Sequence, residues 1–209
     1  MIWESGPWKQ RLLKNADIIE RWAKKRPTER CAFVIEEKVF LSAYAIRRLW
    51  ESQKLSSSFT DRSLKCLVYT ACSDDITINN SHKLDELYDW TSPVDRSVAA
   101  KTFVSLIIHS FIFAQIVKDD DLTVQAFLVT SDRSRYKGLW QVDLIEFVRL
   151  MRVVGNDMPS SVIRVFDIAR NDWFVWQGDG KPPAHVRDEL RRLRHALLSR
   201  QPDKNAPVR

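Results

Sequence analysis

Apolar positions near the amino terminus recur every three or four residues, which is typical of amphipathic helices. One such stripe covers residues 8–23 and a second covers residues 32–50. Pro27 ends the first helix, and the Thr28 hydroxyl is placed to cap the second. Two amphipathic helices joined by so short a break predict an antiparallel helical hairpin over residues 1–54.

The next part of the chain mixes strand patterns with helix patterns. Segments typical of strands are 63–71, 122–130 and 139–142. Residues 102–117 are the most apolar stretch and show no period of two, so they predict a buried helix, with a strand left open over 111–117. A short helix is expected before Trp90.

Helix-end signals are clearest around residues 143–155. Asp143 followed by Glu146 resembles a capping box, and Gly155 fits a left-handed position at the end of the helix. Beyond it, residues 162–169 and 173–176 predict two strands of a hairpin, with a helix over 160–169 as the alternative.

The carboxyl-terminal part predicts a connector over 178–183 and then a basic helix that begins near Ala184. The tail from Gln201 is polar and is expected to be disordered. These patterns together predict an α+β fold, in which an N-terminal helical hairpin packs on a small, mainly antiparallel sheet with a basic C-terminal helix. The expected division is 1–54, 61–178 and 183–209.

Charge is distributed unevenly along the 209 residues. The formal net charge is +6, with basic excess in residues 1–60 and 161–209 and acidic excess between them. Basic ends of this kind indicate a polyanionic partner or an acidic protein surface. Ordinary solvated helix faces produce the same count.

Two basic clusters carry the strongest functional signal. Arg187, Arg191 and Arg194 form a stripe on the last helix beside a leucine seam, and guanidinium groups suit phosphate oxygens. The second cluster is Lys24, Lys25 and Arg26. These six residues are the predicted nucleic-acid contacts, whereas the leucine seam fits a helix that docks on its own core or on a protein partner.

Candidate catalytic residues are few. Asp74 and Asp75 follow a predicted strand, where paired carboxylates can bind Mg²⁺ for phosphodiester hydrolysis, although adjacent strand residues point apart. His109 is a candidate general base, with a buried structural histidine as the simpler interpretation. Asp132 and Arg133 lie in a predicted loop between strands, the kind of place where function often resides.

Several enzyme classes lack their motifs. The five glycines form no phosphate-binding loop, no GxSxG elbow is present, and the four histidines and three cysteines do not approach zinc-ligand spacing. We therefore expect no cofactor and no metal. The odd cysteine count and the lack of a secretory signal indicate reduced, buried thiols in a cytoplasmic protein that does not contact membranes.

The leading hypothesis is a non-catalytic binding subunit of a larger assembly, which contacts a protein and, through its basic terminal helices, nucleic acid. The alternative is a metal-dependent phosphodiesterase or nuclease that uses the paired carboxylates. Eight tryptophans are explained most simply by core packing. Whether the protein is catalytic, and whether it binds a small molecule, stays open at this level.

Overall fold

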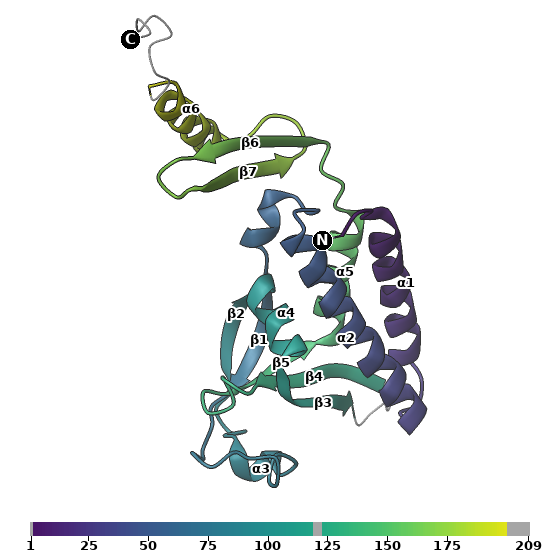
Figure 1. Ribbon diagram of the computed structural model, residues 1–209. Coiled ribbons are helices and arrows are strands. Elements are labelled where there is room, and N and C mark those ends of the chain that lie inside the picture. The colour runs from purple at the N-terminus through teal and green to yellow at the C-terminus, as the bar shows by residue number, and fades with distance from the viewer. Residues whose placement is uncertain (1, 119–122, 200–209) are drawn as a thin grey trace, which may run out of the picture. The chain divides into compact units, whose positions relative to one another are not determined.

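The computed structural model describes residues 2–118 and 123–199, which form two compact units (Figure 1). Unit 1 contains the chain up to Lys54 and Phe59–Asp157, and unit 2 contains Leu55–Ser58 and the chain from Met158. The predicted disordered tail lies outside the described residues. The α+β class predicted from the sequence is confirmed.

Unit 1 begins with the predicted helical hairpin, made by α1 (Gly6–Ala23) and α2 (Glu29–Glu51). The Thr28 hydroxyl accepts a hydrogen bond from the Cys31 backbone N–H at 3.2 Å, so the predicted cap is confirmed. A 3₁₀ turn follows at Ser57–Asp61.

A five-stranded antiparallel sheet forms the centre of unit 1, in the order β2-β1-β5-β4-β3. Its strands are β1 (Ser63–Tyr69), β2 (Val94–Ala99), β3 (Ser110–Lys118), β4 (Thr123–Ser131) and β5 (Leu139–Asp143). The remaining helices of unit 1 are α3 (Leu84–Leu87), α4 (Ala100–Ile108) and α5 (Leu144–Asn156).

Five phenylalanines connect one face of the sheet to its helices. Phe127 of β4 lies 5.3 Å from Phe113 of β3, 5.8 Å from Phe103 of α4 and 5.9 Å from Phe147 of α5, measured between ring centroids. Phe113 in turn lies 5.1 Å from Phe40 of α2. Aromatic rings in such tilted and edge-on pairs add to the energy of burial.

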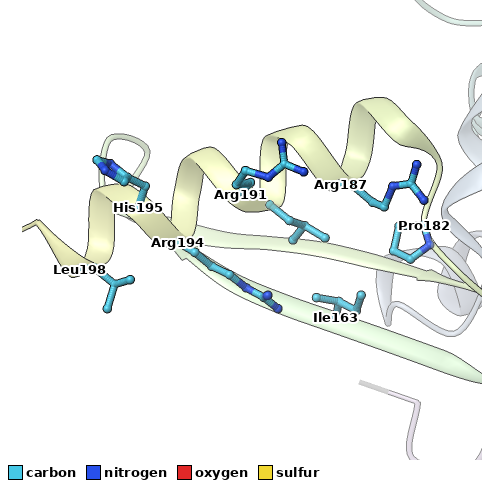
Figure 2. A pocket seen from close by; sticks show the side chains of 8 residues that line it. Ile163, Pro182, Arg187, Arg191, Arg194, His195 and Leu198 are labelled. Atoms are coloured by element: carbon cyan, nitrogen blue, oxygen red, sulfur yellow. The ribbon is translucent and has the colours of Figure 1, made fainter.

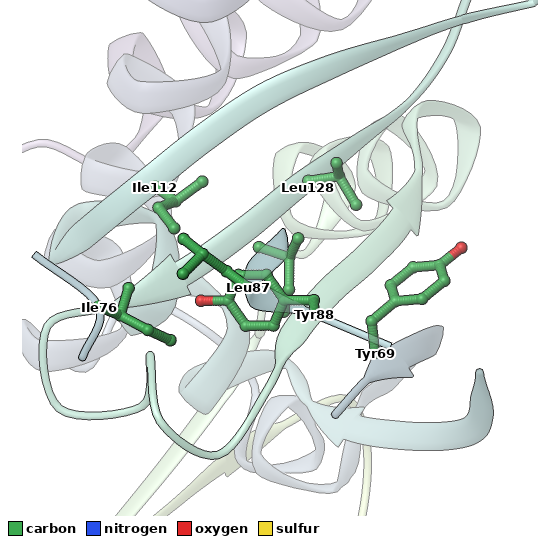
Figure 3. Packing of buried hydrophobic residues seen from close by; sticks show 7 residues of the cluster. Tyr69, Ile76, Leu87, Tyr88, Ile112 and Leu128 are labelled. Carbon is green, nitrogen blue, oxygen red and sulfur yellow. The ribbon is translucent and has the colours of Figure 1, made fainter. Parts of the chain in front are cut away.

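The opposite face of the sheet is also buried. There, Ile112 and Leu128, the neighbours of Phe113 and Phe127 in sequence, point away from the helices into a second apolar cluster (Figure 3). The cover is the connection between β1 and β2, which supplies Ile76, Leu87 and Tyr88. Burial raises the pKa of the Tyr88 phenol to about 12, and its hydroxyl donates to the Arg135 carbonyl at 3.1 Å.

Burial on both faces explains where the pattern over 102–117 misled. The predicted helix ends at Ile108, and the alternative strand over 111–117 is confirmed as β3. A strand with two apolar faces shows no period of two, which is why the pattern favoured a helix. Strand β2 was not predicted, since only Val98 of its six residues is buried. The short helix expected before Trp90 is limited to α3.

Both ends of α5 differ from the prediction. Asp143 precedes the helix but makes no side-chain cap, and Glu146 pairs with Arg149 instead of closing a capping box. Gly155 is helical and not left-handed. Its role is steric, because a methyl group added there would lie 2.6 Å from Leu13 Cγ and Cδ2 on α1.

A buried lysine joins three segments of unit 1. Lys9 of α1 is 1% exposed, and its ammonium donates to the Lys54 carbonyl at 2.8 Å and to the Asp157 carbonyl. The chain leaves unit 1 after each of these two carbonyl groups. Burial lowers the pKa of Lys9, against the opposing attraction of the Asp157 carboxylate.

Unit 2 is a hairpin of β6 (Ser161–Asp167) and β7 (Asp172–Gly178) covered by α6 (Ala184–Leu198). The predicted hairpin is confirmed, the alternative helix over 160–169 is wrong, and Asn171 takes the turn with a φ of 51°. Val165, Leu190 and Leu193 form the core of this unit. The basic helix therefore packs on a small sheet of its own.

We expect Gly155→Ala to lower the free energy of unfolding by up to about 2 kcal/mol. Alanine is favoured over glycine in a helix by about 1 kcal/mol, but overpacking between α1 and α5 costs about 1–3 kcal/mol. Urea unfolding of both proteins measures the difference. Gly6→Ala, where nothing lies within 4 Å of the added methyl group, is the control and should not destabilise. Equal stability of the two variants would contradict the close packing.

We expect Lys9→Met to destabilise the protein by about 3 kcal/mol at pH 7, because two partly buried carbonyl groups lose a charged donor. The folded-state pKa of Lys9 lies below the unfolded value, so between that pKa and pH 10.5 the unfolded chain binds more protons. The stability advantage of the wild type over the variant should therefore grow as the pH rises through this window. Unfolding curves at several pH values measure it.

The control for this experiment is Lys14→Met, which removes an exposed ammonium from the same helix. That variant should show no comparable pH-dependent difference from the wild type. A wild-type advantage over Lys9→Met that shrinks with rising pH would show that burial does not dominate at Lys9.

Candidate functional site

A groove of about 520 Å³ runs along α6 in unit 2 (Figure 2). Its lining combines three arginines with mainly apolar groups. The lining residues are Ile163, Pro182, Arg187, Leu190, Arg191, Arg194, His195 and Leu198. Ile163 is the single contribution from the hairpin, so the groove follows the β6 side of the helix. All three arginines predicted on this helix line it.

Helical spacing gathers these arginines. Positions 187, 191 and 194 are four and three residues apart, which places them on one side of α6. The leucines at 190 and 193 hold the helix to β6 and β7. Figure 2 shows Arg194 extending toward Ile163, whereas the heads of Arg187 and Arg191 lie along the helix and point away from the hairpin.

Carboxylates neutralise only part of this charge. Arg191 lies 3.5 Å from Asp188, and Arg192, outside the groove, is held by Glu189 at 2.6 Å. The hydrogen bond from Arg192 lowers the pKa of Glu189. Arg187 and Arg194 make no ion pair or side-chain hydrogen bond with any residue in the described ranges. Two guanidinium groups of the groove are thus free to bind an external anion.

The hydrogen bonds of β7 establish which backbone groups of β6 face outward. Gln177 N–H donates to the Ser57 hydroxyl at 3.0 Å, and Trp173 N–H donates to its neighbour Asp172 at 2.7 Å. Both N–H groups therefore point away from β6. In an antiparallel ladder, residue pairs whose N–H and C=O groups point away from each other alternate with pairs that are hydrogen-bonded to each other. Gln177 is opposite Val162 and Trp173 is opposite Phe166, so the N–H and C=O groups of Val162 and Phe166 also point away from the partner strand.

The same alternation places the Arg164–Val175 pair among the outward-facing ones. The N–H and C=O groups of Val162, Arg164 and Phe166 consequently line the free edge of β6. No residue in the described part of the chain pairs with these N–H groups. This open edge was missed in the sequence because it depends on the contact between Gln177 and Ser57, which are 120 residues apart.

The hairpin also has an exposed apolar face, opposite to α6. Trp173 is 58% exposed and Val162 is 52% exposed, and Phe166 meets Trp173 edge-on at 5.5 Å. This corrects the expectation that the tryptophans are core residues. Of the eight, which all lie in the described ranges, only Trp176 is buried.

The second predicted basic cluster belongs to unit 1. Lys24, Lys25 and Arg26 follow directly after α1 and are exposed. The Lys25 ammonium stands 3.9 Å from the ring centroid of Trp22. The structure thus places the two basic clusters in different units.

Three of the other candidates do come together. His109, Asp132 and Arg133 line one cavity of about 480 Å³ in unit 1, with hydroxyl groups of α4 and β4. His109 is exposed, so the structural interpretation as a buried histidine is wrong. Arg47 Nη1 lies 3.0 Å from His109 Nε2. Since a guanidinium only donates, Nε2 is the acceptor in this contact. Asp132 is paired with Arg135 at 2.6 Å.

The predicted carboxylate pair lies in an exposed loop after β1. Asp74 and Asp75 are both exposed, and the main-chain groups of Asp75 bond to Ser73 and Asn80. Within residues 2–118 and 123–199, no three His, Cys, Asp or Glu side chains are grouped to hold a metal ion. The acidic run Asp119–Asp121, which the sequence offers as a further source of carboxylates, falls outside the described residues.

The three cysteines are free thiols. Cys31 and Cys66 are buried as expected, and burial raises the pKa of Cys66. Cys72 is exposed, which differs from the expectation.

Comparison with protein-family models, curated proteins and solved structures finds no match to this chain. Among the described helices none has the length and apolar character needed to span a membrane. The cytoplasmic location stays a prediction. The site residues must therefore be interpreted from their own chemistry.

The alternation along β6 predicts a pattern of amide hydrogen exchange. We expect the Ile163 and Val165 amides, which face β7, to exchange at least about tenfold more slowly than that of Arg164, which faces the open edge. Exchange followed by NMR measures these rates residue by residue. The reverse pattern, with Arg164 protected, would mean that the outward groups have been assigned to the wrong residues.

Proposed function

We propose that this chain is a non-catalytic interaction protein that binds an acidic segment of a protein partner in the groove beside α6. The observation that carries the proposal is the convergence of Arg187, Arg191 and Arg194 on one apolar-floored groove, two of them without a carboxylate partner in the described chain. Arginine is a frequent anchor in protein interfaces because its head binds carboxylates while its stem covers apolar surface.

The composition of the groove favours a protein over nucleic acid. Ile163, Leu190 and Leu198 give it an apolar floor, whereas nucleic-acid sites supply aromatic rings for base stacking together with many phosphate contacts. Helix α6 carries four arginines and two carboxylates, and this small excess of positive charge is less than a polyanion site usually has. Nucleic-acid binding by the basic terminal helices is therefore the competing outcome of the test.

The metal-dependent phosphodiesterase hypothesis receives no added support from these contacts. Asp74 and Asp75 have no third ligating side chain grouped with them in the described residues. It stays a prediction.

A charge-reversal experiment tests the proposal. The probe is a capped, fluorescein-labelled peptide of alternating Glu and Val, about eight residues long, which is enough to span the groove in extended form. We expect Arg187→Glu, Arg191→Glu and Arg194→Glu combined to weaken binding of the probe at least about tenfold. The groove then loses the guanidinium groups that pair with the carboxylates of the probe. Fluorescence anisotropy at about 50 mM and about 200 mM salt measures affinity and its electrostatic part.

The matched control is Lys24→Glu, Lys25→Glu and Arg26→Glu combined, which changes net charge equally at the other basic cluster. This variant should keep most of the affinity. An equal loss in both triple variants, or a loss in neither, would refute the groove as the binding site. Tighter binding of an oligothymidylate probe, lost only in the α6 variant, would replace the protein partner by nucleic acid.

A further inference from the structure

We infer that the acidic partner segment binds in extended form, as a third strand added to the open edge of β6. This inference rests on the proposed function and assigns the backbone groups that would hold the partner. Strand addition is a recurring mode of peptide recognition, in which main-chain hydrogen bonds supply affinity and side-chain positions supply specificity.

The first support is the unequal state of the two hairpin edges. On β7, two of the outward N–H groups are already engaged, that of Gln177 by Ser57 and that of Trp173 by Asp172. On β6, the outward groups of Val162, Arg164 and Phe166 have no partner in the described chain. An unpaired strand edge is a ready template for another strand. The edge of β6 is therefore the available one.

The second support is that β6 lacks the usual protections of an edge. Its register with β7 is continuous over seven pairs, without a bulge, and the strand contains no proline. Arg164 is its one charged residue with an outward backbone, and its exposed side chain lies on the face opposite α6, between Val162 and Phe166.

The third support is that the groove lies on the same side as the open edge. From Arg187 to Leu198 the helix rises about 16 Å, at about 1.5 Å per residue. An extended chain covers that length in about five residues, at about 3.3 Å each. The groove thus has the length of an ordinary short strand.

The side chains of an added strand would alternate between two different environments. Those on the α6 side would meet the arginines of the groove, and those on the other side would extend the exposed face where Val162 and Phe166 flank Arg164. The recognised segment is therefore one in which acidic and apolar residues alternate. This is the pattern of the Glu-Val probe.

A proline substitution separates strand addition from simple charge attraction. Arg164→Pro removes an outward N–H and leaves the bonds between β6 and β7 in place, since position 164 does not donate to β7. We expect it to weaken binding of the Glu-Val probe at least about tenfold relative to Arg164→Ala, which removes the same side chain but keeps the N–H.

Val175→Pro is the matched control, because Val175 pairs with Arg164 and its N–H faces the opposite edge. This variant should bind the probe like the wild type. Slow exchange of the Ile163 and Val165 amides in each variant verifies that the hairpin is intact. If Arg164→Pro unfolds it, two N-methylated probes replace that variant, each methylated at alternate residues so that one set of amides is blocked. One of the two should lose binding.

The outcomes distinguish the two proposals. Strand addition would be overturned if binding needs the α6 arginines but survives Arg164→Pro and both N-methylated probes still bind. The groove would then remain the site. Binding that ignores the α6 arginines would overturn the proposed function itself. Protection of the Val162, Arg164 and Phe166 amides that grows with protein concentration, without peptide, would assign the edge to a second copy and overturn the inference.

Discussion

Phe127 is the residue on which the packing of unit 1 depends. Its ring meets those of Phe103 on α4, Phe147 on α5 and Phe113 on β3, so one side chain sets the distance between the sheet and two helices. Its neighbour Leu128 points into the cluster on the other face. A shift of β4 by one residue would move Phe127 into the cluster on the far face and Leu128 into the helix side. Both cores are filled, so this cost fixes the register of β4.

Unit 2 has the opposite construction. A two-stranded hairpin is marginal alone, and α6 stabilises it by covering one face with Leu190 and Leu193. One helix cannot also cover the second face or the outer edge of β6. The groove, the open edge and the exposed Trp173 are therefore consequences of a sheet that stops at two strands. In unit 1, by contrast, both faces of the five-stranded sheet are covered.

The sequence predicts the helices and the basic stripe well because both follow from spacing along one segment. Positions 187, 191 and 194 share a face in any helix. Strand β3 was partly missed because apolar residues on both of its faces remove the alternation that marks a strand. The cavity that joins His109 to Asp132, and the open edge of β6, depend on contacts between distant segments. No local pattern carries that information.

Unit 2 is assembled from discontinuous parts of the chain. Gln177 donates to the Leu55 carbonyl and to the Ser57 hydroxyl, which precede the rest of the unit by about 100 residues. During synthesis, residues 55–58 leave the ribosome long before the hairpin that they support, so unit 2 completes its hydrogen bonds only when the whole of unit 1 has been made. A fragment that starts at Met158 would lack these two acceptors. Expression boundaries for unit 2 should therefore supply Leu55–Ser58 as well.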